Sequence, residues 1–454
     1  MKAQEPRRLF GTDGIRGVAN VDPMTSEIAL SLGRALAYLF QNGHRHRRIL
    51  IGKDTRLSGY MLETALASGI TSMGADVLLV GPMPTPAVAF LTSGMRASAG
   101  VMISASHNTY QDNGIKIFDH NGFKLADEKE RELESLIFSD RLEKSRPAPD
   151  KIGKAFRVEE AKGRYIEFLK GTFPRERTLE GVRLVLDCAN GAAYEIGPTV
   201  FEELGAEVIP LNVKPNGLNI NAQAGAVFPE KVSQKVLETG AHLGIALDGD
   251  ADRVIFVDEQ GRVVDGDAIL AIVGEDLLKK GELKNKTVVG TVMSNIGLDD
   301  YLRKRGGSLV RTQVGDRYLV ERMRKQGYLF GGEPSGHLVF LNASTTGDGM
   351  VGALRVLALM GEQAKTLSEL IVDYQPFPQV LKNVPVKKRV ALEGIPTLEK
   401  KIRDTKAELG DSGRLLVRYS GTEPLVRVMV EGRDAQQIEG MAQEIAACIA
   451  QNLA

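Results

Sequence analysis

Residues 47–56 read Arg-Arg-Ile-Leu-Ile-Gly-Lys-Asp-Thr-Arg, and residues 74–80 read Gly-Ala-Asp-Val-Leu-Leu-Val. Each stretch contains a short apolar run between polar residues, which is typical of a buried parallel strand. The chain between them, from about Gly59 to Ser72, has apolar residues at helical spacing. Together these stretches predict a strand, a loop, a helix and a second strand.

The same order of elements recurs twice further along the chain. Residues 182–191 read Val-Arg-Leu-Val-Leu-Asp-Cys-Ala-Asn-Gly and lead through a predicted helix, at about Ala193–Leu204, to another strand. Residues 287–295 read Thr-Val-Val-Gly-Thr-Val-Met-Ser-Asn and precede a predicted helix near Leu298–Arg305 and a further strand. Three such units predict an α/β protein with three related domains, although a generic α/β enzyme would give a similar pattern.

The C-terminal segment is of a different kind. Residues 414–417 and 425–431 predict strands around a loop, and residues 434–453 predict an amphipathic helix. The Pro-containing stretches 139–154 and 373–388 are expected to be a boundary and a linker. The predicted domains are therefore 1–155, 156–260, 261–374 and a smaller α+β domain at 375–454.

Composition excludes several classes of protein. The chain has 58 Lys+Arg against 58 Asp+Glu, and a general binder of nucleic acid or of an anionic membrane would carry a basic surplus. Two cysteines, Cys188 and Cys448, are too few for a disulfide framework or a Cys-rich zinc site. The charged N-terminus does not resemble a signal peptide, and no run of about 18 apolar residues could span a membrane. We therefore expect a cytoplasmic protein.

Glycine is the one unusual count. The 49 glycines among 454 residues are about 11%, against an average near 7%. They follow no Gly-X-Y period, so collagen is excluded. Many glycines in a folded α/β chain indicate tight loops where the backbone approaches a ligand.

An acidic motif, Asp248-Gly249-Asp250-Ala251-Asp252-Arg253, follows the apolar run Leu243–Leu247. It therefore lies at the end of a predicted strand, where α/β proteins place their sites. Three carboxylates at alternate positions can converge on one hard cation such as Mg²⁺. An EF-hand loop starts similarly, but Arg253 stands where that loop needs glycine, so we exclude it. A solvated acidic turn is the remaining alternative.

A second motif, Ser104-Ala105-Ser106-His107-Asn108, also follows an apolar run. A hydrolase nucleophile is one interpretation, but adjacent residues of an extended chain point to opposite faces, which would place His107 poorly as a base for Ser106. The motif also lacks the Gly-x-Ser-x-Gly elbow of α/β hydrolases. A serine that carries a phosphoryl group against the metal is the second interpretation, and a polar loop is the third.

A third motif, Arg418-Tyr419-Ser420-Gly421-Thr422-Glu423-Pro424, is followed by Arg427. The N–H groups and hydroxyls of its turn can surround an oxyanion, and the two arginines can bind it in bidentate fashion. The pattern indicates a site for a phosphate dianion, with a turn flanked by surface arginines as the alternative.

Two further motifs are rich in glycine. In residues 331–337, Gly-Gly-Glu-Pro-Ser-Gly-His, Glu333 and Ser335 can bind vicinal hydroxyls and His337 offers an imidazole for proton transfer. Residues 10–17 read Phe-Gly-Thr-Asp-Gly-Ile-Arg-Gly. Arg16 in this motif, and Lys116 elsewhere, are candidates for stabilising negative charge during phosphoryl transfer.

In their order along nearly the whole chain, these motifs resemble those of the α-D-phosphohexomutase superfamily, and most closely those of bacterial phosphoglucosamine mutases. Residues 314–318, Val-Gly-Asp-Arg-Tyr, and 345–349, Thr-Thr-Gly-Asp-Gly, add to the likeness with that subgroup. The resemblance implies an α/β fold, with three related α/β domains that have mixed sheets and a smaller C-terminal α+β domain, around a central cleft.

The resemblance also implies a role for each motif. Ser106 would be the phosphoserine, and Asp248, Asp250 and Asp252 would hold Mg²⁺ together with the phosphate on Ser106. The sugar hydroxyls would lie on Glu333 and Ser335, and the distal phosphate on Arg418, Ser420, Gly421, Thr422 and Arg427. Arg16, Lys116 and His337 match positions with electrostatic and acid–base roles, Arg253 matches a position beside the metal, and His107 follows the serine.

The implied activity is the interconversion of glucosamine 6-phosphate and glucosamine 1-phosphate, an isomerase reaction in the supply of amino-sugar and cell-wall precursors. Glucosamine or glucose 1,6-bisphosphate would be the intermediate or activator. The expected partners are small sugar phosphates, and neither nucleic acid nor a membrane is expected to bind. A homodimer is the expected assembly if the chain associates. Phosphoglucomutase or phosphomannomutase activity, a metal-dependent sugar phosphatase and a sugar-phosphate-binding protein are the alternatives.

Overall fold

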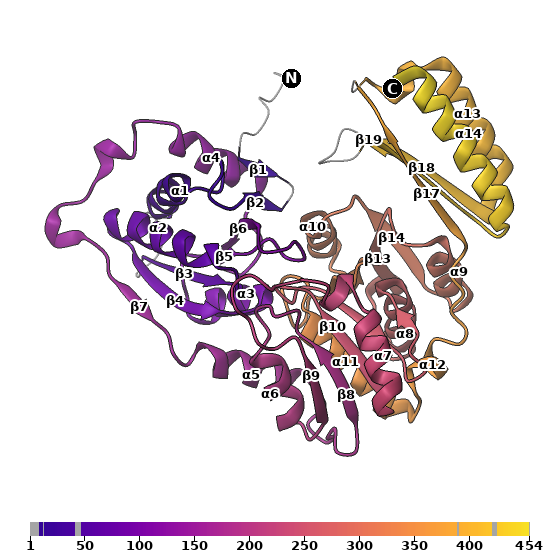
Figure 1. The fold of residues 1–454 in the computed structure, drawn as a ribbon, viewed down its shortest axis with the longest axis horizontal. Helices are drawn as coiled ribbons and strands as arrows, with labels where there is room; N and C mark the ends of the chain where they lie inside the picture. Colours follow the sequence, from indigo (N-terminus) through magenta and orange to yellow (C-terminus); the bar gives the residue numbers. More distant parts are fainter. Residues whose placement is uncertain (1–8, 12, 41–46, 388–389, 420–424, 454) are drawn as a thin grey trace. The chain divides into compact units, whose positions relative to one another are not determined.

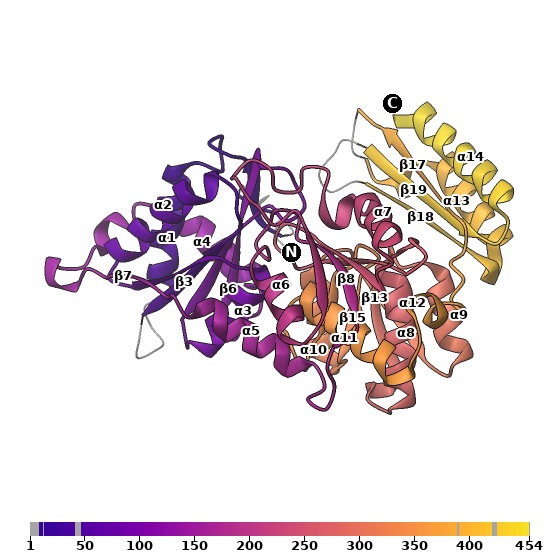
Figure 2. The ribbon, with the colours of Figure 1, turned by 60° about the horizontal axis from the view of Figure 1, so that its bottom comes forward.

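The computed structural model describes residues 9–11, 13–40, 47–387, 390–419 and 425–453 (Figures 1 and 2). The chain divides into two compact units. The first consists of residues 1–293 and 307–372, and the second of residues 294–306 and 373–454. Among the described residues, the first unit contains three sheets and the second unit contains a fourth.

The first sheet combines the predicted strand–helix–strand unit with an N-terminal hairpin. In the described ranges it has seven strands in the order β1-β2-β6-β5-β3-β4-β7. β3 pairs in parallel with β4 and β5, whereas β6 pairs antiparallel with β5 and β2. Its strands are β1 (Phe10–Gly11), β2 (Gly14–Val18), β3 (Arg48–Lys53), β4 (Asp76–Pro82), β5 (Ala99–Ile103), β6 (Asp112–Asp119) and β7 (Ala155–Arg157). Its helices are α1 (Ser26–Leu39), α2 (Ser58–Ser72), α3 (Thr85–Gly94) and α4 (Asp127–Ile137).

The second sheet repeats the parallel unit and extends it with a hairpin. Its order is β12-β11-β10-β8-β9, with β8 parallel to both β9 and β10, and β11 antiparallel to β10. The strands are β8 (Arg183–Asp187), β9 (Glu207–Leu211), β10 (Leu243–Leu247), β11 (Val254–Val257) and β12 (Val263–Val264). The helices of this region are α5 (Ala161–Thr172), α6 (Ile196–Glu203) and α7 (Glu230–Thr239).

The third sheet, of order β14-β13-β15-β16, is again mixed. β13 pairs in parallel with β14 and β15, and β16 is antiparallel to β15. Its strands are β13 (Thr287–Thr291), β14 (Ser308–Thr312), β15 (Phe330–Gly332) and β16 (Leu338–Phe340). The helices here are α8 (Gly266–Lys279), α10 (Asp316–Gln326), α11 (Gly349–Gln363) and α12 (Leu367–Leu370). The three mixed sheets confirm the prediction of three related α/β domains.

The second unit contains an antiparallel sheet of order β17-β19-β18, whose inner face packs against two helices. Alternate residues of β19, Val426, Val428 and Val430, are buried in its core. The helix α14 contributes Ile438 and Ile445 to the same core. Its elements are α9 (Ile296–Lys304), β17 (Gln379–Pro385), α13 (Pro396–Leu409), β18 (Gly413–Tyr419), β19 (Leu425–Gly432) and α14 (Ala435–Leu453). This unit confirms the smaller α+β domain.

One local prediction is wrong. The stretch 373–388, predicted as a linker from its prolines, contains the strand β17, which pairs along its full length with β19. Proline is tolerated there because Pro385 is the last residue of an edge strand. None of the helices in the described ranges has the combination of length and apolar character that a membrane crossing requires.

Candidate functional site

The carboxyl ends of neighbouring strands place the serine motif and the acidic motif. β3 and β5 lie side by side in parallel, so the residues that follow them, Asp54 and Ser104, come from adjacent strand ends. Ser106 lies two residues beyond Ser104. In the second sheet, Asp248 follows β10 directly. These are the strand ends at which open α/β sheets bind ligands.

Ser106 contacts the acidic motif directly. Its Oγ donates a hydrogen bond to Oδ2 of Asp248 at 2.6 Å, and the Ser106 side chain is buried. The backbone of Ser106 has a φ of 53°, in the left-handed region that residues other than glycine seldom adopt. Such a conformation persists only where the surrounding structure holds it, which is typical of functional sites.

The expectation that His107 lies away from Ser106 is wrong. It assumed an extended backbone, whereas the left-handed turn at Ser106 brings Nδ1 of His107 to 3.4 Å from Oγ. Burial, together with the charges of Arg253 and Arg16, lowers the pKa of His107 to about 4, so its ring is neutral near pH 7. Nδ1 accepts a hydrogen bond from Arg253 at 3.1 Å. His107 therefore lies beside the serine as an acceptor for Arg253.

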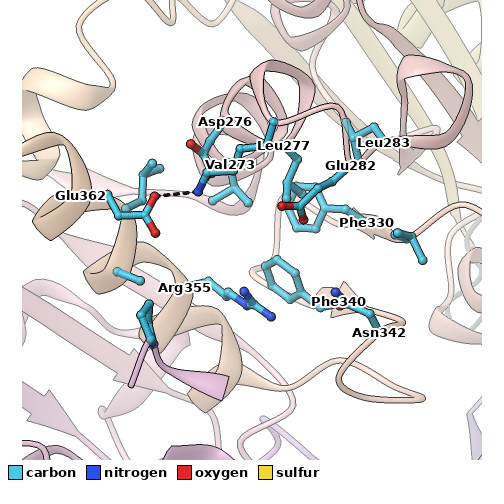
Figure 3. Close-up of a pocket in the computed structure, with 15 residues that line it drawn as sticks. Val273, Asp276, Leu277, Glu282, Leu283, Phe330, Phe340, Asn342, Arg355 and Glu362 are labelled. Carbon is cyan, nitrogen blue, oxygen red and sulfur yellow. Dashed lines mark hydrogen bonds and ion pairs between the residues drawn. The ribbon is translucent and has the colours of Figure 1, made fainter. Parts of the chain in front are cut away.

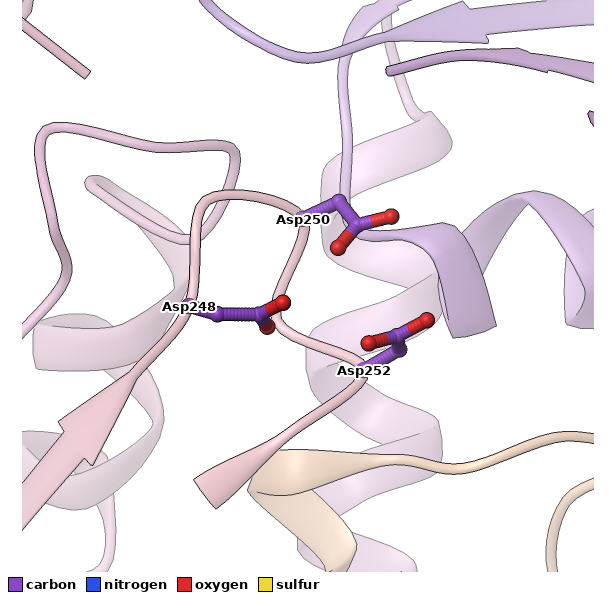
Figure 4. Close-up of side chains that lie close together, drawn as sticks. All are labelled: Asp248, Asp250 and Asp252. Atoms are coloured by element: carbon purple, nitrogen blue, oxygen red, sulfur yellow. The ribbon is translucent and has the colours of Figure 1, made fainter. Parts of the chain in front are cut away.

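The three carboxylates of the acidic motif converge (Figure 4). Asp248, Asp250 and Asp252 each offer an oxygen within 4.8 Å of the others, and all three side chains are buried. Burial and the charges of Asp252 and Asp250 raise the pKa of Asp248 well above its usual range. Within the described chain, Oδ1 of Asp250 and Oδ1 of Asp252 are buried without a hydrogen bond. Buried, unsatisfied carboxylate oxygens are costly, and a bound cation would satisfy them. The arrangement therefore fits a metal.

Lys116 and Thr85 also contact these carboxylates. Nζ of Lys116 lies 2.8 Å from Oδ2 of Asp250 and 3.3 Å from Oδ2 of Asp252. The hydroxyl of Thr85 donates to Oδ2 of Asp250 at 2.5 Å. Burial alone would lower the pKa of Lys116, but the carboxylates of Asp13, Asp250 and Asp252 raise it well above its usual range. Lys116 is therefore held as a cation at the acidic motif.

Lys116 belongs to a closed ring of alternating charges, which we call the charge ring. It consists of Asp13, Lys116, Asp252, His337, Asp316 and Lys124. The first three contacts join Asp13 to Lys116 at 3.6 Å, Lys116 to Asp252 at 3.3 Å and Asp252 to His337 at 3.8 Å. His337 then contacts Asp316 at 3.1 Å and Asp316 contacts Lys124 at 2.9 Å, and Lys124 closes the ring by its ion pair with Asp13. The ring joins residues from all three α/β domains.

His337 is a cation within this ring. Burial alone would lower its pKa, but the carboxylates of Asp316 and Asp252 raise it to about 10. The N–H of Gly347 lies 3.2 Å from Nε2, a contact that a proton on Nε2 weakens. Two carboxylates outweigh one peptide dipole, so we assign the protonated ring. The pKa of Asp316 is lowered, because Lys124 and His337 outweigh the effect of its burial.

The loop after β15 carries Glu333 and Ser335 beside His337. Oε1 of Glu333 accepts from the N–H of Gly315 at 3.1 Å, and Oε2 accepts from the hydroxyl of Ser335 at 3.3 Å. Gly336 has a φ of 85°, and a Cβ at this position would lie 2.0 Å from the carbonyl oxygen of Val254. The loop thus folds tightly onto the strand that follows the acidic motif. The glycine is needed for this contact between two backbones.

Arg16 and Arg253 both form contacts with carboxylates of this group. Arg16, on β2, donates to Oδ2 of Asp13 at 2.5 Å. Arg253 donates its backbone N–H to Oδ1 of Asp248 at 3.1 Å, and its Nε lies 3.9 Å from Oδ1 of Asp252. Carboxylates therefore hold both arginines in place.

In the second unit, Arg418 and Arg427 occupy directly paired positions of β18 and β19. Burial and the charge of Arg427 lower the pKa of Arg418. Two cations at opposite positions of adjacent strands repel each other, so an anion between them would be favoured. Ser420, Gly421 and Thr422, predicted to bind the same phosphate, lie outside the described residues.

Several residues that surround the site were not named as candidates from the sequence. Asp13, Lys124 and Asp316 complete the charge ring, and Arg56 and Asn221 bind the backbone of the serine loop. Asp13 and Asp316 lie inside quoted motifs and were available as candidates. Arg56 ends the stretch that predicts the first α/β unit, but one arginine after a strand gives no sign of being buried.

A cavity of about 70 Å³ lies elsewhere, between α8, α11, β15 and β16 (Figure 3). Phe330 and Phe340 line it, and Lys280 at its edge forms ion pairs with Asp276 at 2.8 Å and Glu362 at 2.6 Å. None of the predicted site residues that the structure describes borders this space. It is a gap inside the third α/β domain and not the candidate site.

Comparison with known protein families agrees with the architecture. The phosphoglucomutase/phosphomannomutase domain models match in order along the chain: alpha/beta/alpha domain I over residues 7–144, domain II over 163–261, domain III over 265–377 and the C-terminal domain over 381–447. The chain belongs to the phosphoglucomutase/phosphomannomutase family, that is, to the α-D-phosphohexomutase superfamily.

Similar curated proteins narrow this assignment. The phosphoglucosamine mutase of Syntrophotalea carbinolica is 59% identical over 448 residues, 98% of each chain. That of Geobacter metallireducens is 60% identical over 97% of this chain and 98% of its own, and that of Myxococcus xanthus is 57% identical over 100% and 99%. Within the superfamily the chain groups with the bacterial phosphoglucosamine mutases, and it is an isomerase of the mutase type.

Solved structures share the fold. A phosphoglucomutase/phosphomannomutase family protein from Burkholderia thailandensis has a TM-score of 0.81 at 24% identity and covers 98% of both chains. Aspergillus fumigatus N-acetylphosphoglucosamine mutase, solved with GlcNAc-6P and magnesium, has a TM-score of 0.68 at 19% identity and covers 98% of this chain and 96% of its own.

Proposed function

We propose that this chain interconverts glucosamine 6-phosphate and glucosamine 1-phosphate by way of a 1,6-bisphosphate, with Ser106 as the carrier of the phosphoryl group. The observation that carries this proposal is the contact of 2.6 Å between the Ser106 hydroxyl and Asp248, inside a buried group of three carboxylates. A phosphoryl group on Ser106 would lie beside that group of acids, which requires neutralising charge.

Asp248, Asp250 and Asp252 are the proposed ligands of Mg²⁺, a hard cation that prefers carboxylate oxygens. When bound, the ion would neutralise charge on the phosphoryl group during transfer. The magnesium in the related Aspergillus structure supports this choice. The two buried oxygens without hydrogen bonds, on Asp250 and Asp252, are the direct support in this chain.

The first transfer breaks the bond between phosphorus and Oγ of phosphorylated Ser106 and forms a bond between phosphorus and the free hydroxyl oxygen of the sugar phosphate. The cations Lys116 and Arg16 stabilise the charge on the transferred group. We assign the acid–base role to His337, which the charge ring holds protonated: it would give its proton to the leaving Oγ of Ser106 and regain one from the sugar hydroxyl. The bisphosphate then turns over and returns its other phosphoryl group to Oγ, which regenerates the phosphoserine. Enclosure of the phosphoserine must exclude water, since hydrolysis would otherwise compete.

Substrate binding is assigned to two groups of residues. Glu333 and Ser335 bind sugar hydroxyls, an assignment supported by their shared hydrogen bond on a loop that ends at His337. Arg418 and Arg427 bind the phosphate that is not transferred, supported by their paired positions and mutual repulsion. Ser420, Gly421 and Thr422 are proposed to complete that phosphate site. The proposed location of the protein in the cell is the cytoplasm.

The test is a substrate panel. Purified enzyme with Mg²⁺ and a trace of glucose 1,6-bisphosphate is supplied with glucosamine, glucose and mannose 1-phosphates and 6-phosphates, and kcat/KM is measured for each. The highest value is expected for the glucosamine phosphates. A dominant rate on mannose or glucose phosphates would assign the chain to the alternative mutase activity, and steady release of inorganic phosphate would indicate a phosphatase.

A further inference from the structure

We infer that Arg56 is a positioning residue for phosphoryl transfer, because its guanidinium holds Ser106 in the left-handed conformation that directs the hydroxyl to Asp248. This inference rests on the proposed function of Ser106. It assigns a role to a residue outside the motifs that predicted the site. Arg56 does not touch the hydroxyl of Ser106, and it acts through the backbone of the serine loop.

All five N–H groups of the Arg56 guanidinium are used. Nε donates to Oδ2 of Asp54 at 2.8 Å, and the other four N–H groups reach backbone carbonyl oxygens of the serine loop. Nη2 donates to Ser106 at 3.0 Å and Asn108 at 2.8 Å. Nη1 donates to Asp112 at 3.1 Å and to Thr109. The loop from Ser106 to Asp112 therefore wraps around one guanidinium.

Arg56 is also connected, through Asp54 and Ser104, to the backbone N–H of Ser106. Oδ2 of Asp54, which accepts from Arg56, also accepts from the hydroxyl of Ser104 at 2.6 Å. The Oγ of Ser104 in turn accepts from the N–H of Ser106 at 2.9 Å. Both the N–H and the C=O of Ser106 are thus connected to the same buried arginine. We call Arg56, Asp54 and Ser104 the clamp.

The clamp explains how a left-handed serine is maintained. For a residue other than glycine this conformation is unfavourable, and it persists where neighbouring groups over-determine it. The N–H and the C=O of Ser106 belong to the peptide units on either side of its Cα, so fixing both leaves that residue little freedom in φ and ψ. The side chain then leaves the backbone in one direction, which ends at Asp248.

Lysine could not replace this arginine. A lysine ammonium is a compact group with three donors, whereas guanidinium offers five in a fixed plane. Arg56 is fully buried, and every carbonyl in the set needs its own donor direction. An Arg56→Lys variant would keep the charge and much of the volume but lose at least two of the hydrogen bonds.

A residue of the second α/β domain, Asn221, also binds the serine loop. Nδ2 of Asn221 donates to the carbonyl oxygens of Ser106 and Asn108, both at 2.8 Å. These are the two carbonyls that Nη2 of Arg56 also binds. Each oxygen thus receives a donor from the first domain and one from the second, which uses both of its lone pairs.

The experiment compares four variants in the full-length enzyme: Arg56→Lys, Ser104→Ala, Lys53→Met and Ser106→Ala. Lys53 is the matched control, because it is buried at the end of β3, three residues before Arg56, and its ammonium pairs with Glu63 at 2.5 Å and not with the carbonyl oxygens of the serine loop. We measure kcat and KM for glucosamine 6-phosphate, Tm, and amide hydrogen exchange of a peptide covering residues 103–113 in the absence of substrate.

Arg56→Lys is expected to lower kcat by about 100-fold, the scale on which a displacement near 1 Å affects a transfer reaction, with KM changed less than about threefold. Exchange in the 103–113 peptide should rise. Ser104→Ala, a small change that preserves packing, should show the same pattern more weakly. Lys53→Met should lower Tm while leaving kcat of the folded enzyme and exchange of the peptide unchanged.

The outcomes test the positioning role of Arg56 separately from the proposed function of Ser106. If Ser106→Ala is inactive while Arg56→Lys and Ser104→Ala only lose Tm and keep their kcat, the positioning role is overturned and the proposed function stands. If Ser106→Ala keeps its mutase activity, the proposed function falls and the role of the clamp in transfer falls with it. Low kcat in both clamp variants, with faster exchange and an unaffected control, supports the inference.

Discussion

The hydroxyl of Ser106 donates to Oδ2 of Asp248 at 2.6 Å, although 142 positions separate the two residues in the chain. The contact joins the first α/β domain to the second. It also explains why neither motif sufficed alone: a serine without an acidic group could belong to a hydrolase, and an acidic turn without a serine could be solvated. The pair supports the proposal of a phosphoryl group held beside a cation site.

Replacing the serine should remove the reaction and preserve the fold. We expect Ser106→Ala to lower kcat by at least about 10³-fold, since loss of a nucleophile leaves only binding and electrostatic contributions. Intact mass after incubation with glucose 1,6-bisphosphate should show the gain of one phosphoryl group in the parent and no gain in the variant. A variant that still gains that mass would show that another residue is the carrier.

Lys116 competes with a cation for the carboxylates of Asp250 and Asp252. Removal of its charge by Lys116→Met should therefore tighten Mg²⁺ binding by about tenfold, the effect of one unit charge at this distance in a partly screened site. The same change should lower kcat, because the proposed transfer needs that cation. The rise of Tm with Mg²⁺ concentration measures the affinity without relying on turnover.

Asp250→Asn is the control for the metal prediction. It removes one proposed ligand, so Mg²⁺ should no longer raise the Tm of this variant over the same concentration range. If Mg²⁺ stabilises the parent and Asp250→Asn equally, the ion binds elsewhere and the acidic motif has another purpose.

Gly336 determines the shape of the loop after β15. A Cβ there would meet the carbonyl oxygen of Val254 at 2.0 Å, with φ at 85°. Gly336→Ala should therefore cost about 2–4 kcal/mol of unfolding free energy and raise KM, since Glu333 and Ser335 lie on the same loop. Urea unfolding and steady-state kinetics check the two effects.

Gly163 provides the opposite case. It lies exposed within α5, and a Cβ there would meet nothing within 4 Å. Gly163→Ala should stabilise the protein by about 0.5–1 kcal/mol, the helix preference for alanine over glycine. Equal destabilisation by both substitutions would refute the steric argument for Gly336.

Asp348 should make stability depend on pH. Its Oδ1 caps α11 by accepting from Met350 and Val351, both at 3.0 Å, and its Oδ2 accepts from the hydroxyl of Tyr165 at 2.7 Å. Burial raises its pKa to about 6 despite these hydrogen bonds. An unfolded aspartate has a pKa near 3.9, so the folded state binds the extra proton between about pH 4 and pH 6. Stability from this group is therefore lost as pH rises through that window.

Asp348→Asn should remove this dependence while keeping the cap. Relative to the parent, the variant should gain about 2–3 kcal/mol between pH 4 and pH 7, measured by urea unfolding at several pH values. The exposed Asp434, which accepts from Gln436 and Gln437, is the matched control for replacing a carboxylate that accepts from a helix N-terminus. A constant difference between Asp348→Asn and its parent would contradict the prediction.

Periodicity in the sequence predicted the α/β units because buried parallel strands form short apolar runs. The strands after residues 47, 182 and 287 lie close to their predicted positions as β3, β8 and β13. The strand β17 was missed since its residues alternate between exposed and partly buried and end in proline, a composition that a linker shares. The helix α13 was missed as well. It lies between residues 373–388 and 414–417, the two stretches for which the sequence made a prediction.

Within the site, we predicted the residues that belong to a recognisable motif. We did not predict the residues that hold those motif residues in place. His107 was misplaced because the argument assumed extended backbone, and a left-handed serine leaves no mark in the sequence. Arg56 was missed because its partners are backbone carbonyls, which every residue has. The ion pair between Lys124 and Asp316 joins the first and third α/β domains, and local sequence patterns do not report such contacts.

The charge ring also constrains how this protein can change over evolutionary time. Each of its six members neutralises two neighbours, so exchange of any one for an uncharged residue leaves buried charges uncompensated. Inherited changes at these positions should therefore occur in pairs of opposite sign, with Lys124 and Asp316 substituted together or not at all. A set of aligned relatives should show covariation between the first and third domains at these positions, and a barrier of low fitness should separate one combination from the next.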